Sequence, residues 1–146
     1  MNLYTIGFTQ KTARDFFNKI KNNEIELLID IRLNNVSQLA GFAKGKDLEY
    51  FLKELCNCEY VHDDIFAPTK ELLDNYRAKK VSWNDYEQVF AEIMDKRNLY
   101  ERFKSLYMKH KNVCLLCTEP TAEQCHRRLV AEYLKKHIEN IEIIHI

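Results

Sequence analysis

The sequence predicts one α/β domain of the three-layer, Rossmann-like type, with a mainly parallel sheet of about five strands between layers of helices. Two observations carry this prediction. Short apolar runs alternate with longer amphipathic runs along the whole chain, and strands joined through helices pair in parallel by right-handed crossovers. The chain of 146 residues suits a single core. We find no repeat, low-complexity tract or shift in composition that would divide residues 1–146.

The first half of the chain alternates strands with helices. The predicted elements are strands over residues 3–6 and 25–31, helices over residues 12–21 and 48–55, and a third strand over residues 58–62. Phe16, Phe17 and Ile20 fall on one stripe of the first helix. The run at 25–31 is apolar almost throughout, as expected for a strand that is covered on both faces. Asp47 is positioned to cap the second helix.

In the second half, two or three helices precede the next strand. The clearest of these helices opens at Ser82, whose hydroxyl can form a capping arrangement with Asp85 three residues later. The remaining predicted elements are a strand over residues 113–117, a helix over residues 123–136 and a last strand over residues 141–146.

Composition narrows the classes of partner. Lys plus Arg and Asp plus Glu number 22 each, so the formal net charge is zero. Dedicated nucleic-acid coats and membrane-surface binders rely on excess positive charge, so neither is expected. A zero net charge is still compatible with a local basic groove. The N-terminus lacks a signal-peptide pattern, and no apolar run approaches the ~20 residues that span a bilayer. We expect a cytoplasmic monomer or homodimer without a membrane partner.

Polar and reactive residues follow three of the predicted strands. In sheets of this type, ligands bind beyond the carboxyl ends of the strands. The residues at these ends are Thr5, Gly7 and Thr9 after the first strand, Asp30 and Arg32 after the second, and Cys117, Glu119, Cys125, His126 and Arg127 after the fourth. We expect them to converge on one edge of the sheet, and this convergence is the strongest functional signal in the chain.

Asp30 and Arg32 share a face, because side chains alternate along a strand. In one interpretation Asp30 serves as an acid, a base or a hydroxyl ligand, and Arg32 binds an anion. In the other interpretation the two residues form an ion pair that closes the strand end. The sequence favours neither.

The five cysteines are expected as thiols, metal ligands or catalytic groups, because their number is odd and no disulfide framework is visible. Alternation points Cys114 and Cys117 in opposite directions, which excludes a redox dithiol. Cys117 ends its strand just before a helix, whose N-terminal dipole favours a thiolate. A buried, inert thiol is the alternative. Cys56 and Cys58 are interpreted as packing residues.

His126 points inward, toward the strand ends, when the apolar stripe of the helix at 123–136 is extended backward. A core histidine bonded to the backbone is one interpretation, and the neighbouring Cys125 and Arg127 favour a functional one. Cys117, Cys125 and His126 with a carboxylate could ligate zinc, but their spacing matches no common zinc pattern. We therefore predict no metal ligands and leave the cofactor open.

The segment between residues 69 and 111 interleaves basic and aromatic side chains. The cations are Arg77, Lys79, Lys80, Arg97, Arg102, Lys104, Lys109 and Lys111, and the aromatics are Tyr76, Trp83, Tyr86, Tyr100 and Tyr107. Such a set can stack on and follow a nucleic-acid strand. Amphipathic helices with solvated faces explain the same pattern, and we favour this interpretation.

Four short motifs occur in order along the chain. They are Thr5-Ile6-Gly7-Phe8-Thr9, Asp30-Ile31-Arg32, Cys117-Thr118-Glu119 and Cys125-His126-Arg127. The chain thereby resembles the family known as domain of unknown function 488, whose members carry Thr-Ile-Gly-His-Ser, Asp-Val-Arg, Cys-Ala-Glu and Cys-His-Arg at these places. Residues 60–69 are similar to one branch of that family. The resemblance covers essentially the whole chain and supports the α/β fold and the site, but implies no activity. Phe8 replaces the usual family His, so a catalytic role of that His does not apply here.

A fainter likeness links Asp30-Ile31-Arg32 and Cys117 to rhodanese-type sulfurtransferases, although their Gly-rich cysteine loop is not reproduced at residues 118–124. Three hypotheses follow. The leading one is an enzyme acting on an anionic small molecule, nucleotide-like, or on nucleic acid. Its catalytic residues would be Cys117, Glu119, Cys125, His126 and Asp30, and its substrate-binding residues Thr5, Gly7, Thr9, Arg32 and Arg127. The second is rhodanese-like thiol or sulfur transfer through Cys117, and the third is a non-enzymatic module that binds nucleic acid or protein.

Overall fold

The computed structural model describes residues 1–36 and 40–146. Within them, five strands form one parallel sheet in the order β3-β2-β4-β1-β5. The strands are β1 (Asn2–Gly7), β2 (Leu27–Asp30), β3 (Glu59–His62), β4 (Asn112–Cys117) and β5 (Glu142–His145). The helices are α1 (Ala13–Asn22), α2 (Gly45–Cys56), α3 (Lys70–Arg77), α4 (Trp83–Arg97), α5 (Leu99–Tyr107) and α6 (His126–His137), with 3₁₀ turns η1 (Gly41–Ala43) and η2 (Asp64–Phe66). The predicted α/β fold with a parallel sheet is confirmed.

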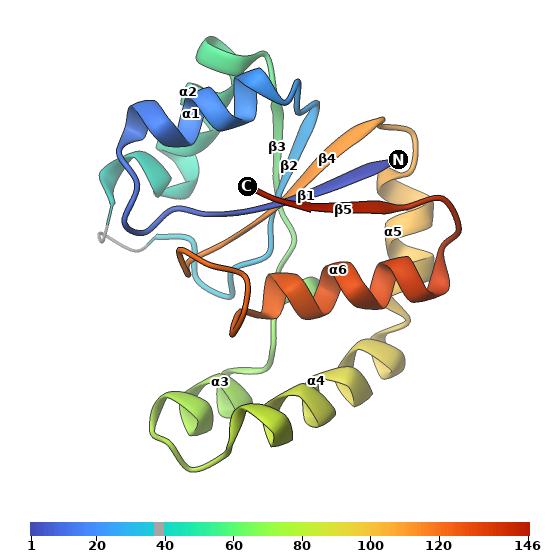
Figure 1. Ribbon diagram of the computed structural model, residues 1–146. Coiled ribbons are helices and arrows are strands. Elements are labelled where there is room, and N and C mark those ends of the chain that lie inside the picture. The colour runs from blue at the N-terminus through green and yellow to red at the C-terminus, as the bar shows by residue number, and fades with distance from the viewer. Residues whose placement is uncertain (37–39) are drawn as a thin grey trace.

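Helices cover both faces of the sheet, with α1 and α2 on one side and α5 and α6 on the other (Figure 1). Leu28 and Cys114 belong to the core beneath α1 and α2, whereas their neighbours Leu27 and Val113 belong to the core beneath α5 and α6. Both faces of β2 and β4 are therefore buried, which explains their continuous apolar runs. Each fully buried apolar side chain of this kind contributes about 1.5–3 kcal/mol.

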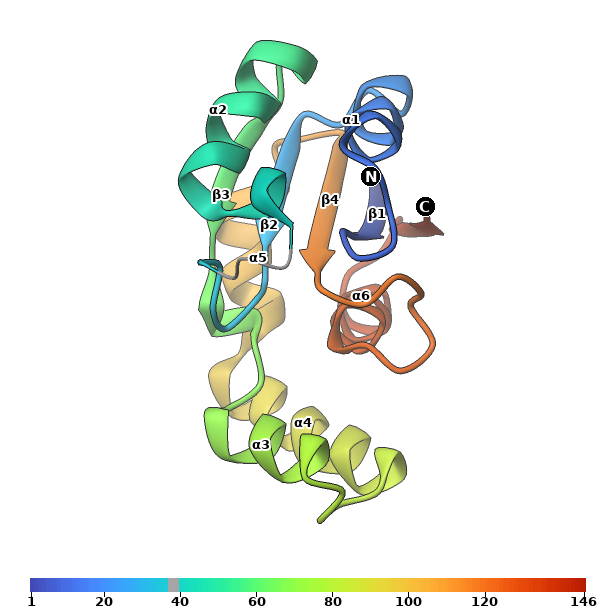
Figure 2. The same ribbon diagram turned by 90° about the vertical axis from the view of Figure 1, so that its left-hand side faces the viewer.

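The helices α3 and α4 lie beyond the end of the sheet toward which β4 points (Figure 2). The chain reaches them after β3 and returns through α5 to β4. Ser82 caps α4 as predicted, since its hydroxyl accepts from the backbone N–H of Asp85 at 3.1 Å. In the described part of the chain, no helix is both long and apolar enough to cross a membrane.

Two predicted helix starts are wrong. Helix α2 begins at Gly45, so Asp47 lies within its first turn and not at its cap. The N–H of Gly45 is instead satisfied by the carbonyl of Asn35 at 2.8 Å. Helix α6 begins at His126 and not at residue 123, because Cys125 has an extended backbone and occupies the N-cap position. Residues 118–125 form a loop over the edge of the sheet.

Candidate active site

The three strand ends meet at one edge of the sheet, as predicted. β4 lies between β1 and β2, where Gly7 pairs with Cys117 and Asp30 pairs with Leu116. Because all the strands are parallel, the segments that follow β1, β2 and β4 leave the sheet side by side. The segments that carry the predicted site residues are therefore neighbours. The contacts of each side chain show which residues face the same cavity.

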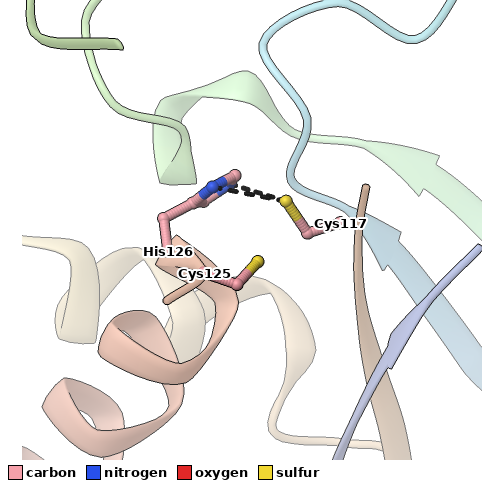
Figure 3. A group of neighbouring side chains, drawn as sticks. All are labelled: Cys117, Cys125 and His126. Carbon is pink, nitrogen blue, oxygen red and sulfur yellow. Dashed lines mark hydrogen bonds between the residues drawn. The ribbon is translucent and has the colours of Figure 1, made fainter. Parts of the chain in front are cut away.

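Cys117, Cys125 and His126 form a buried cluster at this edge (Figure 3). Cys117 ends β4, Cys125 is the N-cap residue of α6, and His126 is its first residue. One potential ligand atom from each residue lies within 4.8 Å of the others. Sγ of Cys117 is 3.3 Å from Nδ1 and 3.6 Å from Nε2 of His126. Since the two distances are nearly equal, the sulfur lies beside the imidazole ring and not along the lone pair of Nδ1.

The imidazole of His126 is held by the backbone of the second strand end. Nε2 lies 2.8 Å from the carbonyl oxygen of Ile31. A carbonyl can only accept, so Nε2 carries a proton and Nδ1 is the nitrogen with a free lone pair in the neutral ring. Phe90 packs against the ring edge-on, at a centroid distance of 6.0 Å. The predicted inward orientation of His126 is confirmed. The hydrogen bond to a backbone carbonyl, which was expected if His126 is a core histidine, is also present.

The two thiols of the cluster differ in acidity. Burial by itself raises the pKa of Cys117, but bonds from the Cys125 thiol and the Thr118 backbone, together with the charge of Arg127, bring the pKa below its ordinary value. The pKa of Cys125 is raised, because it donates to Cys117 and because it is buried. By contrast, burial raises the pKa of Cys58 to about 12. Cys117 is therefore the more acidic of the two thiols.

Arg127 is fully buried behind the cluster. Its guanidinium donates to the carbonyl of Glu119 at 2.5 Å, to the hydroxyl of Thr5 at 3.3 Å and to Sγ of Cys125 at 3.7 Å. Among the described residues, no carboxylate forms a salt bridge with Arg127. Arg127 thus joins β1, the loop after β4 and the start of α6, and its positive charge lies beside the thiols.

The segment after β1 supports the loop that follows β4. Thr9 donates to the carbonyl of Thr118 from its hydroxyl at 2.8 Å and from its backbone N–H at 3.2 Å. A Cβ at Gly7 would lie 1.6 Å from the carbonyl oxygen of Glu119, so a side chain at this position has no space. Thr5 is fully buried. The substrate-binding roles predicted for Thr5, Gly7 and Thr9 stay predictions, since their observed contacts are with the protein itself.

Asp30 and Arg32 form a buried ion pair with exposed fractions of 0% and 3%. The carboxylate accepts from Nε of Arg32 at 2.8 Å, from its Nη2 at 2.7 Å, from its backbone N–H at 3.2 Å, and from the hydroxyl of Tyr60 at 2.7 Å. Burial and the charge of Asp30 raise the pKa of Tyr60 well above its ordinary value. The geometry predicted for the ion-pair interpretation is therefore present, with Tyr60 as a further partner that the sequence pattern did not indicate.

One nitrogen of Arg32 remains without a partner. Nη2 also donates to the carbonyl of Ala43 at 2.7 Å, but Nη1 is buried and has no hydrogen-bond partner among the described residues. The guanidinium carbon lies 5.1 Å from the ring centroid of Phe8, an arrangement that suits a cation–π contact. Phe8, which replaces the usual family His, thus packs against the cation of the predicted anion-binding residue.

A cavity of about 530 Å³ adjoins the cluster. Five of the predicted site residues line it, namely Arg32, Cys117, Glu119, Cys125 and His126. The other five predicted residues, Asp30, Arg127, Thr5, Gly7 and Thr9, are not among its lining residues. The opposite wall comes from α3 and α4 and includes the aromatics Tyr76, Trp83 and Tyr86 and the cations Lys70 and Arg77. Sequence reasoning noted these aromatics but did not place them at the site.

A family profile described as "Domain of unknown function DUF488" matches residues 12–134. The chain belongs to the DUF488 family. The resemblance inferred from the motifs is confirmed, and the matched range includes three of the four, while the motif at residues 5–9 precedes it. Comparisons with curated proteins and with solved structures gave no match. The comparisons therefore assign a family to the chain but no activity.

The basic–aromatic segment of this DUF488 chain packs mainly against itself and the core. Trp83 stacks on Tyr86 with centroids 5.0 Å apart and an interplanar angle of 16°, and Tyr76 packs against both rings. Tyr107 is buried, and Tyr100 stacks on His137 at 5.0 Å. These contacts agree with the amphipathic interpretation. Nucleic-acid binding by the segment stays a prediction.

Proposed function

We propose that this DUF488 protein is an enzyme that acts on an anionic, nucleotide-like substrate in the cavity beyond the strand ends. One observation carries the proposal. A cluster of reactive side chains (Cys117, Cys125 and His126), an exposed carboxylate (Glu119) and a guanidinium with an unpartnered nitrogen (Arg32) all line the same cavity. Its volume of about 530 Å³ lies in the range of small-molecule sites.

Arg32 is the residue best suited to bind the anion. Its Nη1 carries two N–H groups, and a buried donor without a partner costs about 1–3 kcal/mol. An oxygen of a bound phosphate or carboxylate would satisfy this donor. Asp30 already accepts four hydrogen bonds, so its proposed part is to orient Arg32 and not to transfer protons. Arg77 adds an exposed cation on the α3 side of the cavity.

The wall formed by α3 and α4 supports a substrate with a planar ring. Tyr76, Trp83 and Tyr86 pack together there, and all three line the cavity. Aromatic side chains offer a planar ring a large contact area at little entropic cost. An anion site at Arg32 and an aromatic wall on the facing side match the two ends of a nucleotide.

Glu119 is the proposed general acid or base. Its side chain is exposed on the cavity wall, while its backbone carbonyl is fixed by Arg127. The carboxylate therefore extends from an anchored backbone and is free to approach a substrate. Acid–base residues of this kind contribute about 10²–10⁴-fold to a rate. The cluster of Cys117, Cys125 and His126 provides the reacting centre.

The test is a screen for conversion of nucleoside mono-, di- and triphosphates and short single-stranded oligonucleotides, read by liquid chromatography and mass spectrometry. We expect one of these classes to be converted. Glu119→Gln should lower the rate by about 10²–10⁴-fold, and it keeps the carbonyl that anchors Arg127. The matched control is Glu123→Gln, an exposed carboxylate of the same loop that does not line the cavity, and it should leave the rate unchanged.

Two outcomes would contradict the proposal. One is the absence of both conversion and calorimetric binding across the whole panel. The other is conversion that survives both Glu119→Gln and His126→Gln, since the chemistry would then take place elsewhere on the molecule.

A second candidate function is sulfur transfer through Cys117. The observation that favours it is the position of Cys117 at the end of β4, on the cavity wall, with Sγ of Cys125 within 4.8 Å to receive or exchange the sulfur. Incubation with thiosulfate should then leave one extra sulfur atom on Cys117, detected by mass spectrometry of the intact and digested protein. A protein that gains no sulfur would exclude this candidate.

A further inference from the structure

We propose that Cys117, Cys125 and His126 form a binding site for Zn²⁺ whose fourth coordination position opens into the cavity. The catalytic role of this ion rests on the proposed function, whereas metal binding itself can be tested without it. Two thiolates and one imidazole are ligands that Zn²⁺ prefers, and three protein ligands with one open position are the pattern of catalytic rather than structural zinc sites. All three residues line the cavity, so an ion between them would be accessible to substrate.

The spacing of the donors fits a tetrahedral ion after small side-chain movements. With Zn–S of about 2.3 Å and Zn–N of about 2.0–2.1 Å, a tetrahedral site separates N from S by about 3.6 Å and S from S by about 3.8 Å. The donor atoms of the three residues all lie within 4.8 Å of one another. The largest separation therefore has to shrink by at most about 1.2 Å to reach this geometry.

The imidazole already has the tautomer that the site needs. Nε2 donates to the carbonyl of Ile31 at 2.8 Å, which leaves the lone pair of Nδ1 for a metal. Metal-binding histidines commonly donate their second nitrogen to a carbonyl or carboxylate in this way. Sγ of Cys117 now lies beside the ring. The predicted change on binding is a rotation of the Cys117 side chain about its Cα–Cβ bond, toward the ion on Nδ1.

The charge around the cluster favours an anionic fourth ligand. Two thiolates neutralise Zn²⁺, while the guanidinium of Arg127 lies 3.7 Å from Sγ of Cys125 and has no salt-bridge partner among the described residues. A hydroxide or a substrate oxygen on the ion would balance this charge. Arg127 would at the same time hydrogen-bond Sγ of Cys125, and such a bond to a ligand atom orients the ligand and tunes the metal.

With Zn²⁺ in place, Cys117 is a ligand and the reaction of the proposed enzyme is a hydrolysis. The oxygen of a metal-bound water forms the new bond to an electrophilic carbon or phosphorus of the substrate. Glu119 accepts the proton of that water and passes it to the leaving group, which departs with the bonding electron pair.

The experiment measures metal binding directly, without substrate. Protein purified without chelators is analysed for metal by inductively coupled plasma mass spectrometry. It is then stripped, kept reduced, and titrated with Zn²⁺ against a chromophoric chelator and with Co²⁺ by absorption spectroscopy. We expect one ion per chain and thiolate-to-cobalt charge-transfer bands. Cys125→Ser and His126→Asn should each weaken binding by at least about 100-fold. Cys58→Ser, a buried cysteine outside the cluster, should leave binding unchanged.

The proposal is overturned if the reduced protein binds Zn²⁺ no more tightly than Cys125→Ser does, or if bound Co²⁺ shows no thiolate bands. Circular dichroism checks that each variant is folded. If a variant is unfolded, the cobalt spectrum of the unaltered protein decides whether cysteine thiolates bind the metal. The two proposals fail separately. Nucleotide conversion by a protein without metal would support the enzyme proposal and refute the zinc site. Tight zinc binding without nucleotide binding or conversion would support the zinc site and refute the proposed function.

Discussion

Replacing Asp30 by Asn should destabilise the fold strongly. The substitution keeps the shape of the side chain but removes the charge that compensates the buried guanidinium of Arg32, which is 3% exposed. It also replaces one acceptor oxygen by an N–H₂ group that faces the donors of Arg32 and Tyr60. Breaking a buried pair by removing one partner costs about 3–5 kcal/mol. For a chain of this length that corresponds to a fall in Tm of about 10–15 °C.

Chemical unfolding in urea, followed by circular dichroism, measures the free energy of unfolding. Asp74→Asn is the matched control, because Asp74 pairs with Lys70 on the surface, where the partners are 51% and 82% exposed. It should change stability by less than about 0.5 kcal/mol. The double variant Asp30→Asn with Arg32→Met removes both charges and should recover part of the loss. A loss below about 1 kcal/mol for Asp30→Asn, or a double variant with strictly additive losses, would refute the reasoning.

Three further predictions concern the loop, the cavity and the core. Gly7→Ala puts a Cβ 1.6 Å from a carbonyl oxygen and should cost about 1–3 kcal/mol in urea unfolding, so an unchanged midpoint would contradict the tight approach. Arg77→Ala should weaken nucleotide binding in calorimetry by about two- to five-fold, less at high salt, while Lys79→Ala, outside the cavity, should not. Tyr107→Phe removes the hydroxyl that donates to buried Asp63 at 2.5 Å, and thermal unfolding should show that the free energy of unfolding falls by about 1–3 kcal/mol. A smaller fall would mean that a water molecule replaces the hydroxyl as the donor to Asp63.

The sheet could be predicted because both faces of its central strands are buried. The runs at residues 27–29 and 113–117 are apolar without interruption, which favours strands between two helical layers. The position of the candidate site was predicted from the rule that ligands bind beyond the carboxyl ends of parallel strands. The motifs then named Arg32, Cys117 and His126, all of which line the cavity.

The sequence could not separate residues that line the cavity from residues that hold it in place. Arg32 and Arg127 both follow a strand end, and both were predicted to bind an anion. Whether a guanidinium faces the cavity depends on the loop after β4, because the carbonyl of Glu119 in this loop accepts a hydrogen bond from Arg127. The facing wall was not predictable either, because periodicity within α3 and α4 shows which side of each helix is apolar but not where Tyr76 and Trp83 lie relative to the sheet.

The departure at Phe8 bears on which residues can move protons in this chain. The Phe8 ring is buried against the guanidinium of Arg32, 5.1 Å from its central carbon, where a protonated imidazole would meet a like charge. With Phe at this position, the acid–base chemistry of the proposed enzyme would fall to the titratable residues that line the cavity. Nε2 of His126 is held by a backbone carbonyl, and Asp74 is paired with Lys70. In the proposed enzyme, Glu119 would exchange protons with the substrate whether or not Nδ1 of His126 binds a metal, so its replacement by Gln separates an enzyme from a binding module most directly.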